Sequence, residues 1–165
     1  MTQAVELTDK EAFAHVAKCV KEPGAHLENP LTRLSAQRVW TGHNEHQHQC
    51  YWNDRFVAAV LCGMDLQYQR IAAWAVVSNG LSSYFEWTTH YGYDMATALK
   101  YLGVIPEDFD LGPQQCYTRL DFEICEAIVK KFNLPTSRFG RGNLTDEQQE
   151  DRQELDSHYP KFSHL

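Results

Sequence analysis

Three residues with metal-ligating side chains alternate along one short segment of the chain: His46, His48 and Cys50. In an extended segment, side chains two residues apart project from the same face, so these three would share one side of a strand. Imidazole nitrogens and a thiolate suit Zn²⁺, and an open fourth position would hold a catalytic water. With His43 nearby as a further ligand, one hypothesis is a zinc-dependent enzyme or a metal-stabilised domain.

The same spacing also limits the metal hypothesis. Same-face neighbours on one strand lie roughly 6.5–7 Å apart, so three of them rarely share an ion without ligands from elsewhere. Zinc sites usually take a second pair of ligands from a distant segment, and the sequence has no CxxC or HxxxH motif to supply it. We therefore expect no cofactor and interpret the segment as an ordinary polar strand, with zinc as the alternative.

Other catalytic chemistry has no signature in this chain. P-loop, GxGxxG, GxSxG and HExxH motifs are all absent from the sequence. Cys50 with His46 or His48 is the only pair of nucleophile and base that the sequence places close together. The remaining cysteines lie in apolar patterns typical of buried, unreactive thiols: Cys19, Cys62, Cys116 and Cys125. The sequence leaves enzymatic activity open and favours a non-catalytic role.

Acidic residues are concentrated toward the end of the chain. The formal net charge is −7, and residues 145–165 contain six Asp and Glu against two Lys and Arg. This balance argues against direct binding of nucleic acid, which needs a surplus of basic residues, and against an anionic membrane surface. An acidic surface can instead speed the encounter with a basic protein. A nucleic-acid-handling protein is one class of partner that fits.

Aromatic residues form a second candidate surface. Tyr84, Phe85, Trp87, Tyr91 and Tyr93 lie within ten residues, and Trp and Tyr are common at binding hot spots. One strand face must pack on helices, so Phe85 and Trp87 are expected in the core and Tyr84 at a contact surface. The predicted partner-binding residues are Tyr84, Tyr91, Tyr93, Glu107, Asp108, Asp110, Glu147, Glu150, Asp151 and Glu154.

The favoured hypothesis is a non-catalytic regulator, such as an inhibitor, an immunity factor or an adaptor, that binds a protein partner through this acidic and aromatic surface. A short chain with no catalytic motif, an excess of acid and abundant Trp and Tyr is also typical of small proteins from mobile elements. A homodimer through an unpaired sheet edge or the aromatic patch is a further arrangement that the sequence allows.

The cellular compartment is inferred from targeting and membrane signals that the sequence lacks. Residues 1–7 have neither the basic start nor the apolar run of a signal peptide. The longest apolar stretches, Phe56–Met64 and Ile71–Val77, are far shorter than the roughly 20 residues that span a bilayer. Five cysteines without tight spacing indicate reduced thiols. We expect a cytoplasmic protein that does not enter a membrane.

The elements that would position these residues begin with two helices. Thr8 and Glu11 fit a capping box, and apolar residues then recur at helical spacing. A second helix is expected to begin at Pro30, because proline suits the first helical position. Its apolar residues Leu31 and Leu34 are expected to face inward.

The middle of the chain, about residues 38–90, fits an antiparallel meander. Asn79-Gly80 is the strongest two-residue hairpin signal, and folding about it places Trp74 opposite Phe85. The rival interpretation is helical, because apolar residues within 55–77 also fit a 3.6-residue stripe and alanine favours helix. We favour strands because of the Asn79-Gly80 signal.

The last third of the chain is expected to be helical. Asp94 can cap a helix through Leu102, a longer helix is expected over residues 114–133, and Thr145 can cap a final acidic helix whose only apolar residue is Leu155.

The predicted fold is α+β: an N-terminal helix, a central antiparallel β-meander of four to five strands, and two to three C-terminal helices, with a mostly α fold as the alternative. Residues 1–143 are expected to form a single globular domain, followed by an acidic C-terminal helix or tail over residues 144–165.

Overall fold

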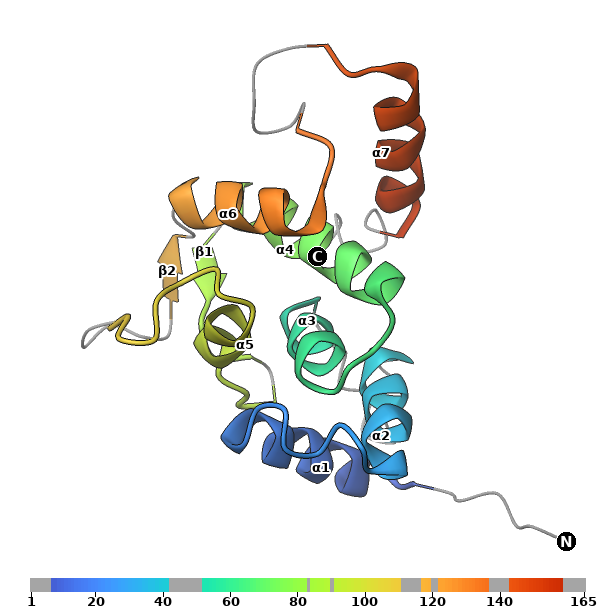
Figure 1. Ribbon diagram of the computed structural model, residues 1–165, viewed down its shortest axis with the longest axis vertical. Coiled ribbons are helices and arrows are strands. Elements are labelled where there is room, and N and C mark those ends of the chain that lie inside the picture. The colour runs from blue at the N-terminus through green and yellow to red at the C-terminus, as the bar shows by residue number, and fades with distance from the viewer. Residues whose placement is uncertain are drawn as a thin grey trace, which may run out of the picture.

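The computed structural model describes residues 7–41, 52–82, 84–89, 91–110, 117–119, 122–136 and 143–158. These ranges are largely helical (Figure 1), with α1 (Asp9–Lys21), α2 (Pro30–Thr41), α3 (Trp52–Leu61), α4 (Leu66–Ser82), α5 (Met95–Tyr101), α6 (Phe122–Phe132) and α7 (Asp146–His158). The strands β1 (Tyr84–Glu86) and β2 (Tyr117–Arg119) form a short antiparallel pair, in which Phe85 lies opposite Thr118.

Helices α3 and α4 form the centre of the molecule. Every side chain from Phe56 to Leu61 and from Ile71 to Val77 is buried. A helix that is apolar on all sides must be enclosed by other elements. Helices α1, α2 and α5 contact α3, while α6 and α7 contact α4, and Figure 1 shows this central pair between the two groups.

The predicted central β-meander, and with it the α+β fold, is wrong; the mostly helical alternative describes these residues. Asn79-Gly80 lies within α4 instead of a hairpin turn, and Trp74 therefore does not pair with Phe85. The physical reason is that a completely buried segment has no polar alternation that would separate a strand from a helix. In the run 66–82 the alanines favour helix, and a helix satisfies its own backbone hydrogen bonds in an apolar core.

Helix starts were predicted correctly where a side chain caps the backbone. The Glu11 amide donates to the Thr8 hydroxyl at 3.1 Å, and the Thr8 amide donates to the Glu11 carboxylate at 3.4 Å, which confirms the capping box. The Asp94 carboxylate accepts from the Ala96 amide at 2.9 Å, as expected of an N-cap.

The predicted helix over residues 114–133 is confirmed only from Phe122 onward. Residues 117–119 are extended, because they pair with β1 as strand β2. The buried face of α6 consists of Ile124, Cys125, Ile128, Val129 and Phe132.

The face of α2 that packs inward is opposite to the predicted one. Leu31 and Leu34 are 36% and 40% exposed, whereas the buried positions are Thr32, Ser35, Ala36 and Val39. Small side chains let α2 approach its neighbours closely, and their polar groups are satisfied locally. The Ser35 hydroxyl, for instance, donates to the Leu31 carbonyl at 2.6 Å.

No helix within the described ranges combines the length and the hydropathy needed to cross a membrane.

Candidate functional site

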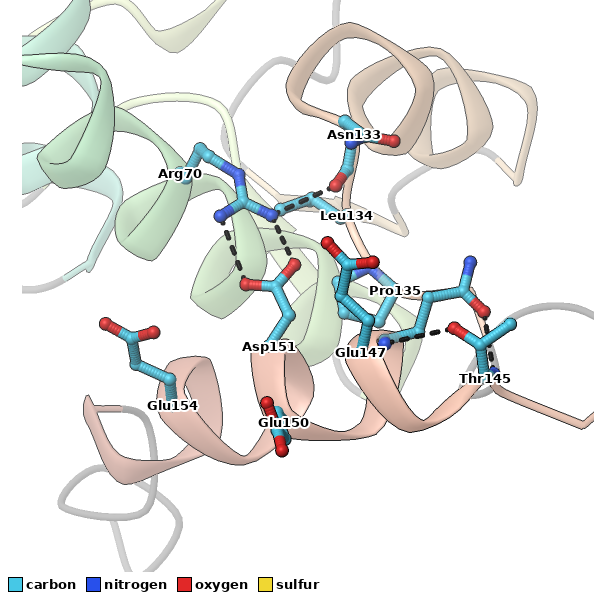
Figure 2. A pocket seen from close by; sticks show the side chains of 10 residues that line it. Arg70, Asn133, Leu134, Pro135, Thr145, Glu147, Glu150, Asp151 and Glu154 are labelled. Carbon is cyan, nitrogen blue, oxygen red and sulfur yellow. Dashed lines mark hydrogen bonds and ion pairs between the residues drawn. The ribbon is translucent and has the colours of Figure 1, made fainter.

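An open hollow of about 600 Å³ lies between α7 and the C-terminal end of α6 (Figure 2). Arg70 of α4 and Asn133, just after α6, line it on one side. Helix α7 lines the other side with four carboxylates, those of Glu147, Glu150, Asp151 and Glu154. All four belong to the partner-binding residues that the sequence predicts.

Arg70 connects three elements of the structure at this hollow. Its two terminal nitrogens donate to the two carboxylate oxygens of Asp151, at 3.1 and 2.6 Å. Its Nε donates to the Phe132 carbonyl at 2.9 Å, and Nη2 also donates to the Asn133 carbonyl at 3.0 Å. A guanidinium is suited to this, because its planar fork matches a carboxylate and neutralises the negative C-terminal end of a helix.

The end of α6 is shaped so that Arg70 can reach it. Asn133 has a φ of 51°, the left-handed conformation that commonly ends a helix. This turn leaves the last carbonyl groups without partners in the helix itself, and the Arg70 guanidinium supplies two of the missing donors.

A second polar contact fixes α7 further along its length. The indole Nε1 of the fully buried Trp74 donates to Asp156 at 2.8 Å, and Leu155, next to Asp156, is only 3% exposed. At the other end, Thr145 and Gln148 cap α7 reciprocally, at 3.0 and 3.2 Å. The predicted final helix is therefore confirmed, and α7 docks on α4 mainly through polar contacts and one leucine.

Three glutamates of α7 line the hollow without a neutralising partner among the described residues. Glu147, Glu150 and Glu154 are exposed, and none of them forms an ion pair within the described part of the chain. In Figure 2, Glu147 and Glu154 extend from the same side of α7 as Asp151, whereas Glu150 points away. The hollow thus combines one neutralised carboxylate with flanking carboxylates that remain available to a cation.

Of the predicted contact residues, Tyr93 is buried and Tyr91 is half-buried. The ring of Tyr91 stacks on Phe13 at 4.1 Å between centroids, and its backbone amide donates to the buried carboxylate of Asp54 at 3.1 Å. Tyr93 is 3% exposed, and its hydroxyl donates to the Phe13 carbonyl at 3.1 Å. Both tyrosines hold α1 against the segment before α5.

Three further predicted residues are not brought to the hollow. Glu107, Asp108 and Asp110 are exposed on the loop after α5 and do not line it. Tyr84 belongs to β1, but its side chain lies outside the described part of the structure.

The predicted metal ligands also lie outside the described residues: His43, His46, His48 and Cys50. Within the described ranges, no group of three or more His, Cys, Asp and Glu side chains could hold a metal ion.

A buried polar cluster between α1, α2 and the turn that joins them was missed by the sequence analysis. The Thr32 hydroxyl donates to the His26 carbonyl at 2.6 Å and lies 2.7 Å from His15 Nε2. Burial, together with the charges of His26 and Lys18, lowers the pKa of His15. A signal that could have revealed the cluster was the run of small residues Thr32, Ser35 and Ala36 at helical spacing.

The acidic hollow is a candidate site formed by described residues. Its lining side chains are carboxylates, amides, a threonine, an arginine and apolar groups. Several exposed carboxylates on one helix can attract a cationic group. No protein-family model, curated protein or solved structure matches this chain.

Proposed function

We propose that the protein is a non-catalytic regulator, such as an inhibitor, an immunity factor or an adaptor, which binds a protein partner. The acidic hollow receives a basic segment of that partner. One observation carries this proposal: Glu147, Glu150 and Glu154 line the hollow and form no ion pair with any described residue, while Asp151 on the same helix is already neutralised by Arg70.

The division of roles among these carboxylates supports a binding surface. Asp151 and Asp156 fix α7 to α4, so the helix presents the other carboxylates from a defined position. Exposed charges contribute little affinity each, but together they steer an oppositely charged partner and raise its association rate. Such binding weakens as salt is added, because exposed charges are screened over about 8 Å at physiological ionic strength.

The experiment compares two triple variants that remove the same charge. The variant E147Q/E150Q/E154Q alters the hollow, and the control E28Q/E107Q/D108N removes three exposed carboxylates elsewhere. A short oligolysine peptide serves as the basic probe, and fluorescence anisotropy measures its Kd. We expect the hollow variant to bind about tenfold more weakly, since three exposed pairs of about 0.5 kcal/mol approach the free energy of a tenfold change.

The control should bind the peptide within about twofold of the wild type, because distant exposed charges are screened. Equal losses in both variants would mean that the peptide responds to net charge, and the hollow would then not be the site. The same variants are then used to retain proteins from the native host. A partner lost only with the hollow variant and at high salt supports the proposal, and the absence of any retained protein contradicts it.

A further inference from the structure

Exposed apolar side chains gather along α2 and the chain next to it. Among the described residues, seven large apolar side chains are more than a third exposed, and five of them belong to the turn before α2, to α2 itself and to the start of α4. We call these five side chains the leucine surface: Leu27, Leu31, Leu34, Leu66 and Tyr68. Single exposed apolar residues are ordinary, whereas a cluster of them marks an interaction surface.

Three leucines of this surface follow the spacing of one helix face. Leu27, Leu31 and Leu34 are separated by four and then three residues, the intervals at which side chains lie above one another along a helix. They occupy the outer side of α2, because small residues such as Ala36 occupy its inner side. Helix α2 therefore has apolar residues on two sides, as is typical of a helix that is covered on both.

Two contacts join α2 and the turn before it to the beginning of α4. A Cβ atom on Gly63 would lie 2.9 Å from Leu27 Cδ2, so Leu27 lies directly against the backbone there. The rings of Trp40 and Tyr68 meet edge to face, with their centroids 5.1 Å apart. Figure 1 shows α2 and the beginning of α4 at the same edge of the molecule. The leucine surface is therefore formed by neighbouring segments held in fixed positions.

The charges in this region cancel. Although the whole chain carries a formal charge of −7, residues 27–41 and 63–68 contain as many basic as acidic residues, namely Glu28, Asp65, Arg33 and Arg38. Two copies of an acidic protein repel each other, and they approach best where their local charges cancel. A strongly basic partner is drawn instead to the acidic hollow. The charge distribution thus favours a second copy of this chain as the occupant of the leucine surface.

We propose that the leucine surface is the interface of a symmetric homodimer, in which α2 packs antiparallel to α2 of a second copy. In such an interface every contact occurs twice. A two-fold axis that crosses α2 between Leu31 and Leu34 places each of these leucines beside the other one of the second copy. The same axis brings Glu28 opposite Arg38 of the second copy. The Arg38 side chain is 43% exposed although it pairs with Asp9, so it is accessible to this contact.

The size of the surface sets the strength of the dimer. Five side chains exposed to this degree present about 400 Å², and the charged rim raises the covered area to about 600 Å² per copy, against about 800 Å² per partner in a standard interface. We therefore expect a reversible dimer with a micromolar dissociation constant. It goes beyond the proposed function and does not depend on it, because none of the five side chains lines the acidic hollow.

Sedimentation velocity of the full-length chain between about 1 and about 500 µM tests the dimer, because this range includes a micromolar dissociation constant. We expect the mass to rise from 19.0 kDa toward twice that value. L31S/L34S should weaken association at least about a hundredfold, since each dimer loses four leucines from its interface. The control Y101S/F122S alters the other two of the seven exposed side chains and should dimerise within about twofold of the wild type.

A charge variant tests the antiparallel arrangement. E28K makes the net charge less negative, which by itself favours association, but it places a second cation opposite Arg38 of the other copy. We expect E28K to weaken the dimer about fivefold, because the contact occurs twice. E107K changes the net charge equally at an exposed position outside the leucine surface, and it should not weaken the dimer. A dimer strengthened equally by E28K and E107K would overturn this arrangement.

The proposal is overturned if the wild type stays monomeric over the whole range, or if Y101S/F122S weakens the dimer as much as L31S/L34S does. Circular dichroism checks that each variant is folded. If L31S/L34S unfolds, L27S/L66S takes its place, because these two side chains are 43% and 62% exposed. A monomeric wild type that still binds oligolysine would overturn the dimer and leave the proposed function intact, since the two surfaces share no residue.

Discussion

Arg70 and Asp151 form a two-point ion pair across the interface of α4 and α7, with nitrogen–oxygen distances of 3.1 and 2.6 Å. The Arg70 and Asp151 side chains are only 24% and 30% exposed, so solvent screens this pair less than a surface pair. The same guanidinium also binds two carbonyls at the end of α6, and its loss would leave several acceptors without donors.

We expect R70A to lower the free energy of unfolding by about 1–3 kcal/mol, because it removes a partly buried charged pair and two further hydrogen bonds. Urea denaturation measures this change. The matched control is R33A, since Arg33 and Asp65 form an exposed pair at 2.6 Å whose side chains are 56% and 70% exposed. R33A should change stability by no more than about 0.5 kcal/mol, and equal effects of the two variants would contradict this account of Arg70.

Leu155 and Arg70 are expected to act on the same docking equilibrium. L155A removes the one buried apolar side chain of α7 and should weaken its docking on α4. If either change already releases α7, the double variant L155A/R70A should lower the free energy of unfolding by clearly less than the sum of the two single effects. Hydrogen exchange at the α7 amides checks that α7 itself is released, with the amides of α3 staying protected. If the losses of unfolding free energy add up in the urea experiment, the two residues stabilise separate regions.

His15 makes the stability depend on pH in a defined direction. Burial, and then the charges of His26 and Lys18, lower its pKa in the fold from 6.5, so folding favours neutral His15. The unfolded chain then binds more protons than the fold below about pH 6.5, and stability falls as the pH falls through that range toward the lowered value. We expect unfolding curves to show this loss and H15Q to reduce it. H158Q, at the exposed end of α7, is the control and should leave the pH dependence unchanged.

The zinc hypothesis has a direct test of its own. We expect the protein purified without a His tag to contain no bound metal, and a chelator to leave its melting temperature unchanged. Elemental analysis and thermal unfolding measure these two properties. About one zinc per chain, lost in H46A and C50A and destabilising when it is removed, would show that the histidine segment holds the metal.

Local signals in the sequence were enough to locate helix ends, because a cap is formed by neighbouring residues. Thr8 with Glu11, and Thr145 with Gln148, show this at the two ends of the described chain. The same signals failed at Asn79-Gly80, because α4 continues through these two residues after its buried run Ile71–Val77.

The candidate site was predictable only in part. The sequence identified Glu147, Glu150 and Glu154 as acidic surface residues, because charge density needs no three-dimensional information. It did not reveal that Arg70, which lies far away in the chain, neutralises Asp151. This pairing depends on which helices pack together, and Arg70 was predicted to lie in a sheet.

The docking of α7 on α4 has a consequence for any measurement made at the acidic hollow. One wall of the hollow is α7 itself, so the binding surface exists only in the fraction of molecules in which Arg70 holds that helix in place. The apparent Kd then equals the intrinsic Kd divided by this fraction. A variant such as R70A would therefore weaken a basic ligand without touching it, whereas substitution of Glu147 would change the intrinsic Kd. The population of the docked state and the contact with the ligand are thus separable at this site, because Arg70 of α4 controls the first and Glu147 of α7 the second.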